Sequence, residues 1–258
     1  MDVLELDDPD AGAWLAERHI ETRAPKRPAS PGGSEPAGRR VPRRDRSPCG
    51  RMHMLLGCSI ARDSQMNVVG DDLIFNKARG GETWSKLSRA LPGLIAEWRR
   101  AASAFGVPLG STIFWLSGND AYERGTGQNA FTTMPAEEVE ALERTIRTVI
   151  EVARATSLSV VVLGPLPRIV YDNTLPWEHT ASYKLDRKVK EATTGDEFIS
   201  LGKALTKKMG RKSRHLIIED CRPWFAKDGI HLSPRGYEKI AAVDKLPAWV
   251  VLRAAAVE

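Results

Sequence analysis

The stretch MHMLLGCS, residues 52–59, joins a short apolar run to a Gly-Cys-Ser turn. A run of this length that ends in turn residues is typical of a buried strand. Further short apolar runs follow, separated by longer amphipathic stretches, and this alternation indicates βαβ units and a parallel sheet. We therefore predict five strands, at residues 52–56, 72–75, 112–116, 159–163 and 215–218.

Apolar residues recur with helical spacing in the stretches between and after these strands. Residues 84–105 have it in spite of Pro92, and residues 136–155 have it most strongly. Two more helices are predicted at 196–209 and 234–243. Right-handed crossovers then place helices on both faces of a parallel five-stranded sheet, which is a three-layer α/β/α sandwich.

The chain divides into an N-terminal arm, residues 1–50, and one domain, residues 51–258. The arm is dense in Pro, Gly, Ser and Arg, and such a composition does not repay the entropy of ordering. We expect it to be disordered apart from a short helix around Trp14. A chain of 258 residues with 42% hydrophobic residues can bury one sizeable core after that arm.

Cysteine usage and hydropathy bear on the compartment. The three cysteines lack Cys-x-x-Cys spacing and predict neither a disulfide framework nor a zinc ribbon. No apolar run approaches the roughly 20 residues that span a bilayer. The N-terminus is acidic rather than that of a signal peptide. We therefore expect a soluble protein of the cytoplasm or nucleus, without a membrane span.

Ligand sites of parallel α/β sheets lie outside the carboxyl ends of the strands. Four of the predicted loops there carry residues suited to chemistry, and we expect them to meet at one edge of the sheet. They are Gly57-Cys58-Ser59, residues 76–83, Ser117-Gly118-Asn119-Asp120 and Asp228-Gly229-Ile230-His231.

These loops hold the parts needed for acyl transfer. Ser59 follows a strand at a turn, where its hydroxyl can project as a nucleophile. His231 can serve as the base and pass the proton to the leaving group. Asp228, three residues earlier, can hold the other nitrogen of the imidazole. The sequence therefore predicts a catalytic triad of Ser59, His231 and Asp228.

The same loops offer donors for an oxyanion. The backbone N–H of Ser59 and that of Gly81 are candidates, since a missing side chain lets a ligand approach the main chain. Gly80 precedes Gly81 directly and is the alternative donor. Asn119 supplies a side-chain amide. We predict an oxyanion hole formed by Ser59, Gly81 and Asn119.

The order and spacing of the four loops, over residues 52–243, resemble the conserved blocks of the SGNH (GDSL) serine hydrolases. The match of residues 118–120 and of residues 228–231 is the most specific part. The resemblance implies a flavodoxin-like SGNH hydrolase fold and hydrolysis of carboxylic esters or acetyl esters through the residues named above. It implies no metal and no organic cofactor. Cys58 departs from the family, because the residue before the nucleophile is usually aspartate.

Each of these residues also has a plainer interpretation. A serine after a strand is often a helix cap, and Asp-Gly or Asn-Asp pairs are common in turns. Cys58 is an alternative nucleophile. Trp84, Trp115 and Trp224 suit core packing, although Trp224 precedes the last block closely enough to line a substrate pocket.

Other enzyme classes fit the sequence less well. Residues 57–61 come within one residue of the Gly-x-Ser-x-Gly elbow of α/β-hydrolases, but that fold needs several strands before its nucleophile. Neither a phosphate-binding GxxxxGK[ST] loop nor GxGxxG follows any predicted strand. An HExxH zinc motif is also absent from the sequence.

A different class of function stays open, a catalytically weak SGNH-like module that binds rather than cleaves. Residues 163–168, with Trp224 before the last block, are also similar to SGNH domains carried in retrotransposon open reading frames. Clustered arginines of the arm, Arg39, Arg40, Arg43, Arg44 and Arg46, could contact nucleic-acid phosphates. Arg51 follows directly after the arm.

Overall fold

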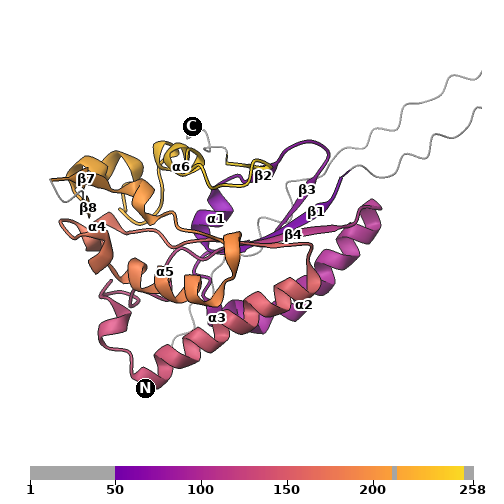
Figure 1. Ribbon diagram of the computed structural model, residues 1–258, viewed down its shortest axis with the longest axis horizontal. Coiled ribbons are helices and arrows are strands. Elements are labelled where there is room, and N and C mark those ends of the chain that lie inside the picture. Colours follow the sequence, from indigo (N-terminus) through magenta and orange to yellow (C-terminus); the bar gives the residue numbers. More distant parts are fainter. Residues whose placement is uncertain (1–49, 211–213, 253–258) are drawn as a thin grey trace, which may run out of the picture. The chain divides into compact units, whose positions relative to one another are not determined.

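A computed structural model describes residues 50–210 and 214–252 (Figure 1). The predicted N-terminal arm, apart from Gly50, lies outside the described residues, so the structure does not address its predicted disorder or its arginine cluster. No helix within the described ranges is long and apolar enough to cross a bilayer.

The centre of the domain is a five-stranded sheet with the order β3-β1-β4-β5-β6. Every neighbouring pair in it is parallel. In order along the chain these strands are arranged 2-1-3-4-5, which is the order of the flavodoxin-like fold that the resemblance implied. They are β1 (Met52–Gly57), β3 (Leu73–Asn76), β4 (Leu109–Trp115), β5 (Val160–Leu163) and β6 (Phe198–Ile199).

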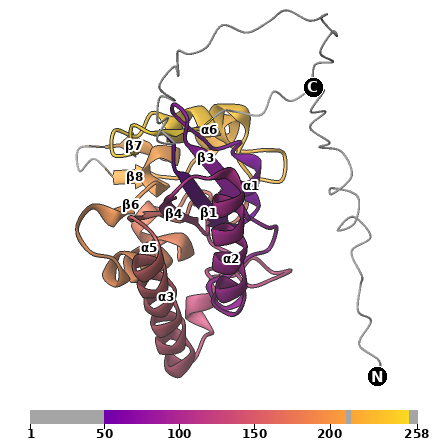
Figure 2. The ribbon, with the colours of Figure 1, turned by 90° about the vertical axis from the view of Figure 1, so that its right-hand side faces the viewer.

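Helices cover both faces of this sheet, which gives the predicted three layers. Figures 1 and 2 show α2, α3 and α5 on one side of the strands and α6 on the other. The helices are α1 (Ser59–Asp63), α2 (Trp84–Phe105), α3 (Ala136–Thr156), α4 (Ile169–Asp172), α5 (Ala181–Ala192) and α6 (Pro234–Ala241).

Two hydrophobic cores fill the spaces between the layers, because side chains along a strand point alternately to opposite faces. On β4, Phe114 packs in the core with α2, α3 and α5. Its neighbours Ile113 and Trp115 pack in the core with α1 and α6. Strands buried on both faces read as continuous apolar runs, and for this reason the sequence indicated them clearly.

Local sequence signals mark the boundaries of the two long helices. At the start of α2, the Thr83 hydroxyl accepts the N–H of Lys86, and the helix ends at Gly106 in the left-handed region, with φ +68°. Pro92 lies inside this helix, as its apolar spacing predicted. α3 follows Pro135 and buries an apolar stripe that includes Ile146 and Ile150.

The prediction of a fifth sheet strand at 215–218 was wrong. The strand β8 (Arg214–Leu216) instead pairs antiparallel with β7 (Lys207–Met209) in a separate two-stranded sheet. The last strand of the main sheet is β6, which pairs with β5. A two-residue strand carries too little periodicity to be recognised, and only its pairing with β5 defines it.

The prediction of a helix at 196–209 was also wrong, because tertiary contacts rather than local spacing of apolar residues decide the conformation of this segment. This segment contains β6, a 3-10 turn at Gly202–Leu205 and β7. Gly202 packs its backbone on Trp177, where a Cβ would come within 2.1 Å of the indole ring. Helical spacing of apolar residues was present, but pairing of the edge of β5 and packing on Trp177 decided the conformation.

A further small sheet ties the end of the described chain to the domain. In it β2 (Asn67–Val68) pairs antiparallel with β9 (Val250–Val251).

In the main sheet the chain passes from β1 to β3 on one side and then to β4 on the other. The topological switch point therefore lies between β1 and β4, where α/β sheets of this kind place their ligand site.

Candidate active site

Ser59 lies at the switch point, as the first residue of α1 directly after β1. The turn from strand to helix is tight. The N–H of Cys58 still bonds to the carbonyl of Trp115 on the neighbouring strand, at 3.1 Å. A Cβ on Gly57 would come within 2.4 Å of that carbonyl oxygen. Glycine at position 57 is thus what allows Ser59 to stand at the end of the strand.

The Asp228 carboxylate organises the loop that carries His231. Its Oδ1 accepts the backbone N–H groups of Ile230 and His231, at 2.9 and 3.0 Å. The intervening Gly229 has φ +68°, a conformation that side chains rarely adopt. An Asx turn of this kind folds from local residues alone. The local sequence therefore places Asp228 beside His231.

Ser59, His231 and Asp228 form a continuous chain of hydrogen bonds. The Ser59 Oγ lies 2.8 Å from His231 Nε2, and His231 Nδ1 lies 2.5 Å from Asp228 Oδ2. With Nδ1–H donated to the carboxylate, Nε2 is left to accept the serine proton. The structure thus brings the three predicted residues together across a sequence separation of 172 residues.

Electrostatics keep the carboxylate ready for this arrangement. Burial acts to raise the pKa of Asp228, but the hydrogen bonds from His231 and from the backbone of Ile230 outweigh it, and the pKa lies below its ordinary value. Asp228 is therefore ionised at neutral pH. An ionised partner holds the imidazole tautomer and stabilises the imidazolium that forms during proton transfer.

The Asn119 side chain is held at both ends in the loop after β4. Its Nδ2 donates to the carbonyl of Glu82 at 2.9 Å, and its Oδ1 accepts from the guanidinium of Arg168 at 2.8 Å. An amide nitrogen carries two protons. One proton of Nδ2 therefore remains to be offered to a ligand in the cleft.

Gly80 and Gly81 both border the same cleft as Ser59. Gly81 has φ +66°, and its carbonyl accepts the ammonium of Lys86. The arrangement brings both candidate donors to the cleft, and the choice of Gly81 over Gly80 as the oxyanion donor stays a prediction.

The cleft between these loops has a volume of about 410 Å³. Cavities of a few hundred Å³ are the usual size for small-molecule sites. Its walls come from the loops after β1, β3, β4 and β5 and from the loop before α6. The lining residues are Ser59, Ile60, Arg62, Gly80, Gly81, Ser117, Asn119, Arg168, Ile230 and His231.

Some solved structures have a fold similar to that of this chain. One is TesA, 15% identical, with a TM-score of 0.48 over 74% of this chain and 93% of that one. Another is a lipase/acylhydrolase from Enterococcus faecalis, 14% identical, with a TM-score of 0.48 over 73% and 90%. A third is the psychrotrophic esterase EstA from Pseudoalteromonas sp., 11% identical, with a TM-score of 0.45 over 74% and 92%. No protein-family model and no curated protein matches the sequence. At such low identity the likeness extends to the fold alone.

Cys58, the alternative nucleophile, faces the core rather than the cleft. Its side chain is only 2% exposed and packs beside α1 and α6. The Sγ lies 2.8 Å from the hydroxyl of Ser117. A buried thiol with this partner does not reach a substrate that contacts Ser59, and the geometry favours Ser59 as the nucleophile.

Trp224, predicted as a substrate-pocket residue, does not line the cleft. Its ring makes cation–π contacts with the ammonium groups of Lys207 and Lys239, at 5.5 and 5.1 Å from the ring centroid. The 3-10 turn Glu219–Trp224 before the last block directs the indole toward α6, and proximity in sequence to His231 did not bring it to the site. Trp84 and Trp115 are fully buried, as expected for core residues.

The sequence analysis did not identify two arginines of the cleft, Arg62 and Arg168, as site residues. A usable signal existed for both. Arg62 follows Ser59 by three residues and so shares a face of α1 with it. Arg168 follows β5, and the rule that directed attention to the carboxyl ends of the other strands applies to this strand as well.

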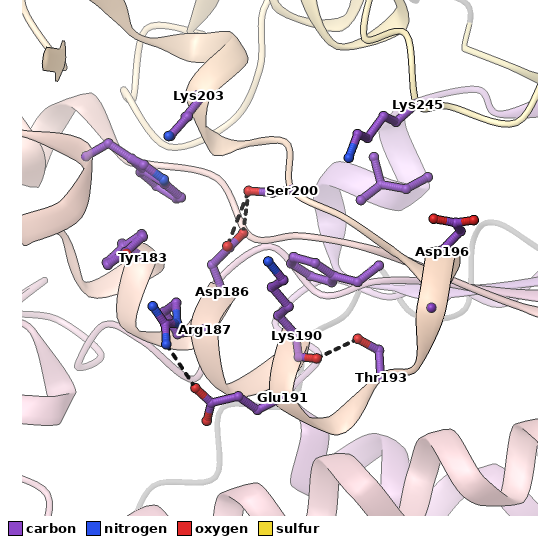
Figure 3. Close-up of a pocket in the computed structure, with 14 residues that line it drawn as sticks. Tyr183, Asp186, Arg187, Lys190, Glu191, Thr193, Asp196, Ser200, Lys203 and Lys245 are labelled. Carbon is purple, nitrogen blue, oxygen red and sulfur yellow. Dashed lines mark hydrogen bonds and ion pairs between the residues drawn. The ribbon is translucent and has the colours of Figure 1, made fainter. Parts of the chain in front are cut away.

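A larger cavity, of about 1050 Å³, lies along α5 and β6 and contains none of the predicted catalytic residues. Figure 3 shows Asp186 there, with Ser200 donating to its carboxylate. Burial raises the pKa of Asp186 to about 6. The lysines and carboxylates that surround it do not form a nucleophile and base pair, so volume alone does not locate the chemistry of this protein.

Proposed function

We propose that this protein is a serine hydrolase that cleaves carboxylic esters, with Ser59 as the nucleophile, His231 as the general base and Asp228 as the residue that orients it. The observation that carries the proposal is the hydrogen-bond chain from Ser59 Oγ through the imidazole to Asp228, at 2.8 and 2.5 Å, at the edge of a cleft. Nucleophile, base and orienting group within hydrogen-bond reach are the signature of activated serine.

In the proposed reaction the Ser59 Oγ attacks the ester carbonyl carbon while its proton passes to His231 Nε2. The carbonyl oxygen becomes an oxyanion. When the intermediate collapses, the imidazolium gives its proton to the departing alcohol and an acyl-serine remains. Water then attacks the carbonyl carbon of the acyl-serine while His231 takes one of its protons. When this second intermediate collapses, His231 gives the proton to the Ser59 Oγ, the acid is released and the hydroxyl of Ser59 is restored.

The oxyanion needs donors that are already in place before the reaction. We assign this role to the Ser59 N–H, the N–H of Gly81 and the free Nδ2 proton of Asn119. The support is that all three residues border the cleft and that Asn119 is held at both ends of its amide. A donor with a fixed orientation costs no reorganisation when the charge develops.

The size of the cleft bears on the kind of ester. About 410 Å³ holds a small ester but does not enclose a long lipid chain. The resemblance of the four loops to the SGNH hydrolases agrees with esterase or acetyl-ester deacetylase activity. We therefore expect turnover to fall as the acyl chain lengthens.

The test is labelling of the full chain with a fluorophosphonate probe, combined with hydrolysis of 4-nitrophenyl acetate, butyrate and octanoate. We expect a single adduct on Ser59 and loss of label and turnover in Ser59→Ala. The matched control is Ser103→Ala, which removes an exposed hydroxyl from α2. It should leave both unchanged. Full labelling of Ser59→Ala, or a wild type that takes no label and hydrolyses none of the esters, would refute the proposal.

The alternative from the sequence, nucleic-acid binding through the arginine-rich arm in the context of a mobile element, stays a prediction, because residues 1–49 lie outside the described residues. A protein lacking residues 1–49 separates the two functions. Ester turnover that persists in it belongs to the domain. RNA or DNA binding that is salt-dependent and lost on the same truncation belongs to the arm.

A further inference from the structure

The charged side chains that line the cleft are cationic. Arg62 and Arg168 border it together with Ser59 and His231, and no aspartate or glutamate is among its lining residues in the described part of the chain. Ester hydrolysis at a serine does not by itself require guanidinium groups. Their presence bears on what the substrate carries besides its ester.

Arg168 is held firmly in this position. Its guanidinium carbon lies 4.5 Å from the ring centroid of Tyr122, a cation–π contact, and one nitrogen donates to Asn119 Oδ1 at 2.8 Å. The Tyr122 hydroxyl in turn donates to Asp172 at 2.5 Å and is close to Ser182. A guanidinium has five N–H donors, so several remain for a ligand in the cleft.

The charge of Arg168 is not cancelled by an ion pair. Within residues 50–210 and 214–252 no carboxylate lies within 4.0 Å of its guanidinium nitrogens. Asp172, the nearest candidate in sequence, accepts the backbone N–H of Arg168 at 2.8 Å and the Tyr122 hydroxyl instead. Burial raises the pKa of Asp172, although the Tyr122 hydrogen bond and the charge of Arg168 act to lower it, so Asp172 offsets the charge of Arg168 only in part.

Other carboxylates near the catalytic loops have partners other than Arg168, apart from Glu82, whose Oε1 is buried without a hydrogen-bond partner. Asp63 pairs with Arg62 at 2.7 Å, with both side chains about half exposed. Asp120 accepts the backbone N–H of Trp84 at the start of α2. Asp228 accepts from His231 and its loop. A substrate in the cleft therefore meets positive charge at Arg168 that no ion pair among the described residues neutralises, whereas Arg62 is paired with Asp63.

A third guanidinium stands at the rim. The exposed Arg124 places a nitrogen 3.7 Å from where a Cβ of Gly81 would lie, beside the glycine pair that borders the cleft. Arg62 places a nitrogen 3.5 Å from the corresponding position of Gly80. Arg168 in the cleft and Arg124 beside Gly81 at its rim thus place positive charge near one small volume, and a field of one sign focused in a cleft attracts ligands of the opposite sign.

We propose that the esters hydrolysed at this site carry an anionic group, a carboxylate or a phosphate, that Arg168 binds while Ser59 attacks the ester carbonyl. The inference rests on the proposed serine hydrolase. Arg168 is then a specificity-determining residue as well as the residue that orients the Asn119 amide. A planar guanidinium pairs with such groups through two hydrogen bonds, which a lysine cannot match.

The test uses two pairs of esters that differ only in charge. On the acyl side these are 4-nitrophenyl hydrogen adipate and its methyl ester. On the alcohol side they are 4-acetoxybenzoate and methyl 4-acetoxybenzoate. For each pair the ratio of kcat/KM, anionic over neutral, is divided by the same ratio for hydroxide-catalysed hydrolysis. We expect the wild-type ratio to be about 10- to 100-fold in favour of the anion for at least one pair, the size of a charge-assisted hydrogen bond.

Variants then assign the preference to one side chain. Arg168→Met should reduce the ratio to near unity, and Arg168→Lys should keep part of it. Any loss of Asn119 orientation slows both members of a pair and cancels in the ratio. Arg147→Met, an exposed arginine of α3 that does not line the cleft, removes the same charge and should leave the ratio at the wild-type value. The ratio should also fall as salt is added.

Outcomes against the inference are distinct from those against the proposed function. A wild type that hydrolyses neutral and anionic esters with a ratio near unity for both pairs refutes the inference and leaves the hydrolase intact. So does Arg168→Met with the wild-type ratio, or Arg147→Met with the same loss as Arg168→Met. A wild type that hydrolyses none of the four esters refutes the proposed function, and the inference falls with it.

Discussion

Asp228→Asn separates catalysis from stability at the proposed active site. The asparagine keeps an oxygen that can accept the N–H groups of Ile230 and His231, at present held at 2.9 and 3.0 Å. Its amide nitrogen, however, takes the place of the oxygen that lies 2.5 Å from His231 Nδ1. Two donors cannot face each other, so the imidazole proton moves to Nε2. An Nε2–H cannot accept the proton of Ser59.

The expected loss of kcat is therefore large and the loss of stability small. The same exchange in serine proteases costs about 10⁴ in kcat, which corresponds to about 5 kcal/mol. Unfolding should change by less than about 1 kcal/mol because the turn keeps its bonds. Asp228→Ala should lose activity and also about 1–2 kcal/mol, since water can replace bonds to a side chain that is 46% exposed.

The measurements are kcat for 4-nitrophenyl acetate and the free energy of unfolding in urea. Asp244→Asn, an exposed aspartate away from the cleft, is the matched control and should alter neither. Asp228→Asn with activity within about tenfold of the wild type would show that the carboxylate does not set the tautomer, and the reasoning from the 2.5 Å contact would be wrong.

Three more predictions follow from particular contacts. Asn119→Ala should lower kcat by about 10² to 10³, the usual effect of one oxyanion donor, and an unchanged kcat for 4-nitrophenyl acetate would make Asn119 a purely structural residue. Cys58→Ala should keep activity and lower the free energy of unfolding by about 1–2 kcal/mol. Cys58→Asp should lower it by more, because the buried carboxylate has only Ser117 nearby as a donor. Loss of turnover in Cys58→Ala would instead identify the thiol as the nucleophile. Burial raises the pKa of Asp120 from 3.8 to about 7. The contribution of Asp120 to stability is therefore fully present below about pH 4 and is lost as the pH rises to about 7, by a few kcal/mol at most. The thermal midpoint of the wild type should fall relative to that of Asp120→Asn between pH 5 and 8, and parallel midpoints would contradict this.

Long regular elements were determined by the sequence alone. Apolar runs and periodicity in the sequence indicated the strands that became β1, β4 and β5 and the helices α2 and α3. The loop of Asp228 and His231 was also readable, because an Asx turn depends on neighbours in sequence. The rule for carboxyl ends of parallel strands located Ser59, but the loop of His231 follows no strand of the main sheet, and packing of the whole domain brings it to Ser59.

Short or non-local features were decided only in the tertiary structure. β6 has two residues and exists because β5 offers an unpaired edge, and the segment after it follows the surface of Trp177 rather than its own helical spacing. Whether Trp224 or Arg168 reaches the cleft depends on which residues pack beneath each loop. Such contacts join residues far apart in the chain and leave no periodicity in the local sequence, so only packing of the whole domain selects them.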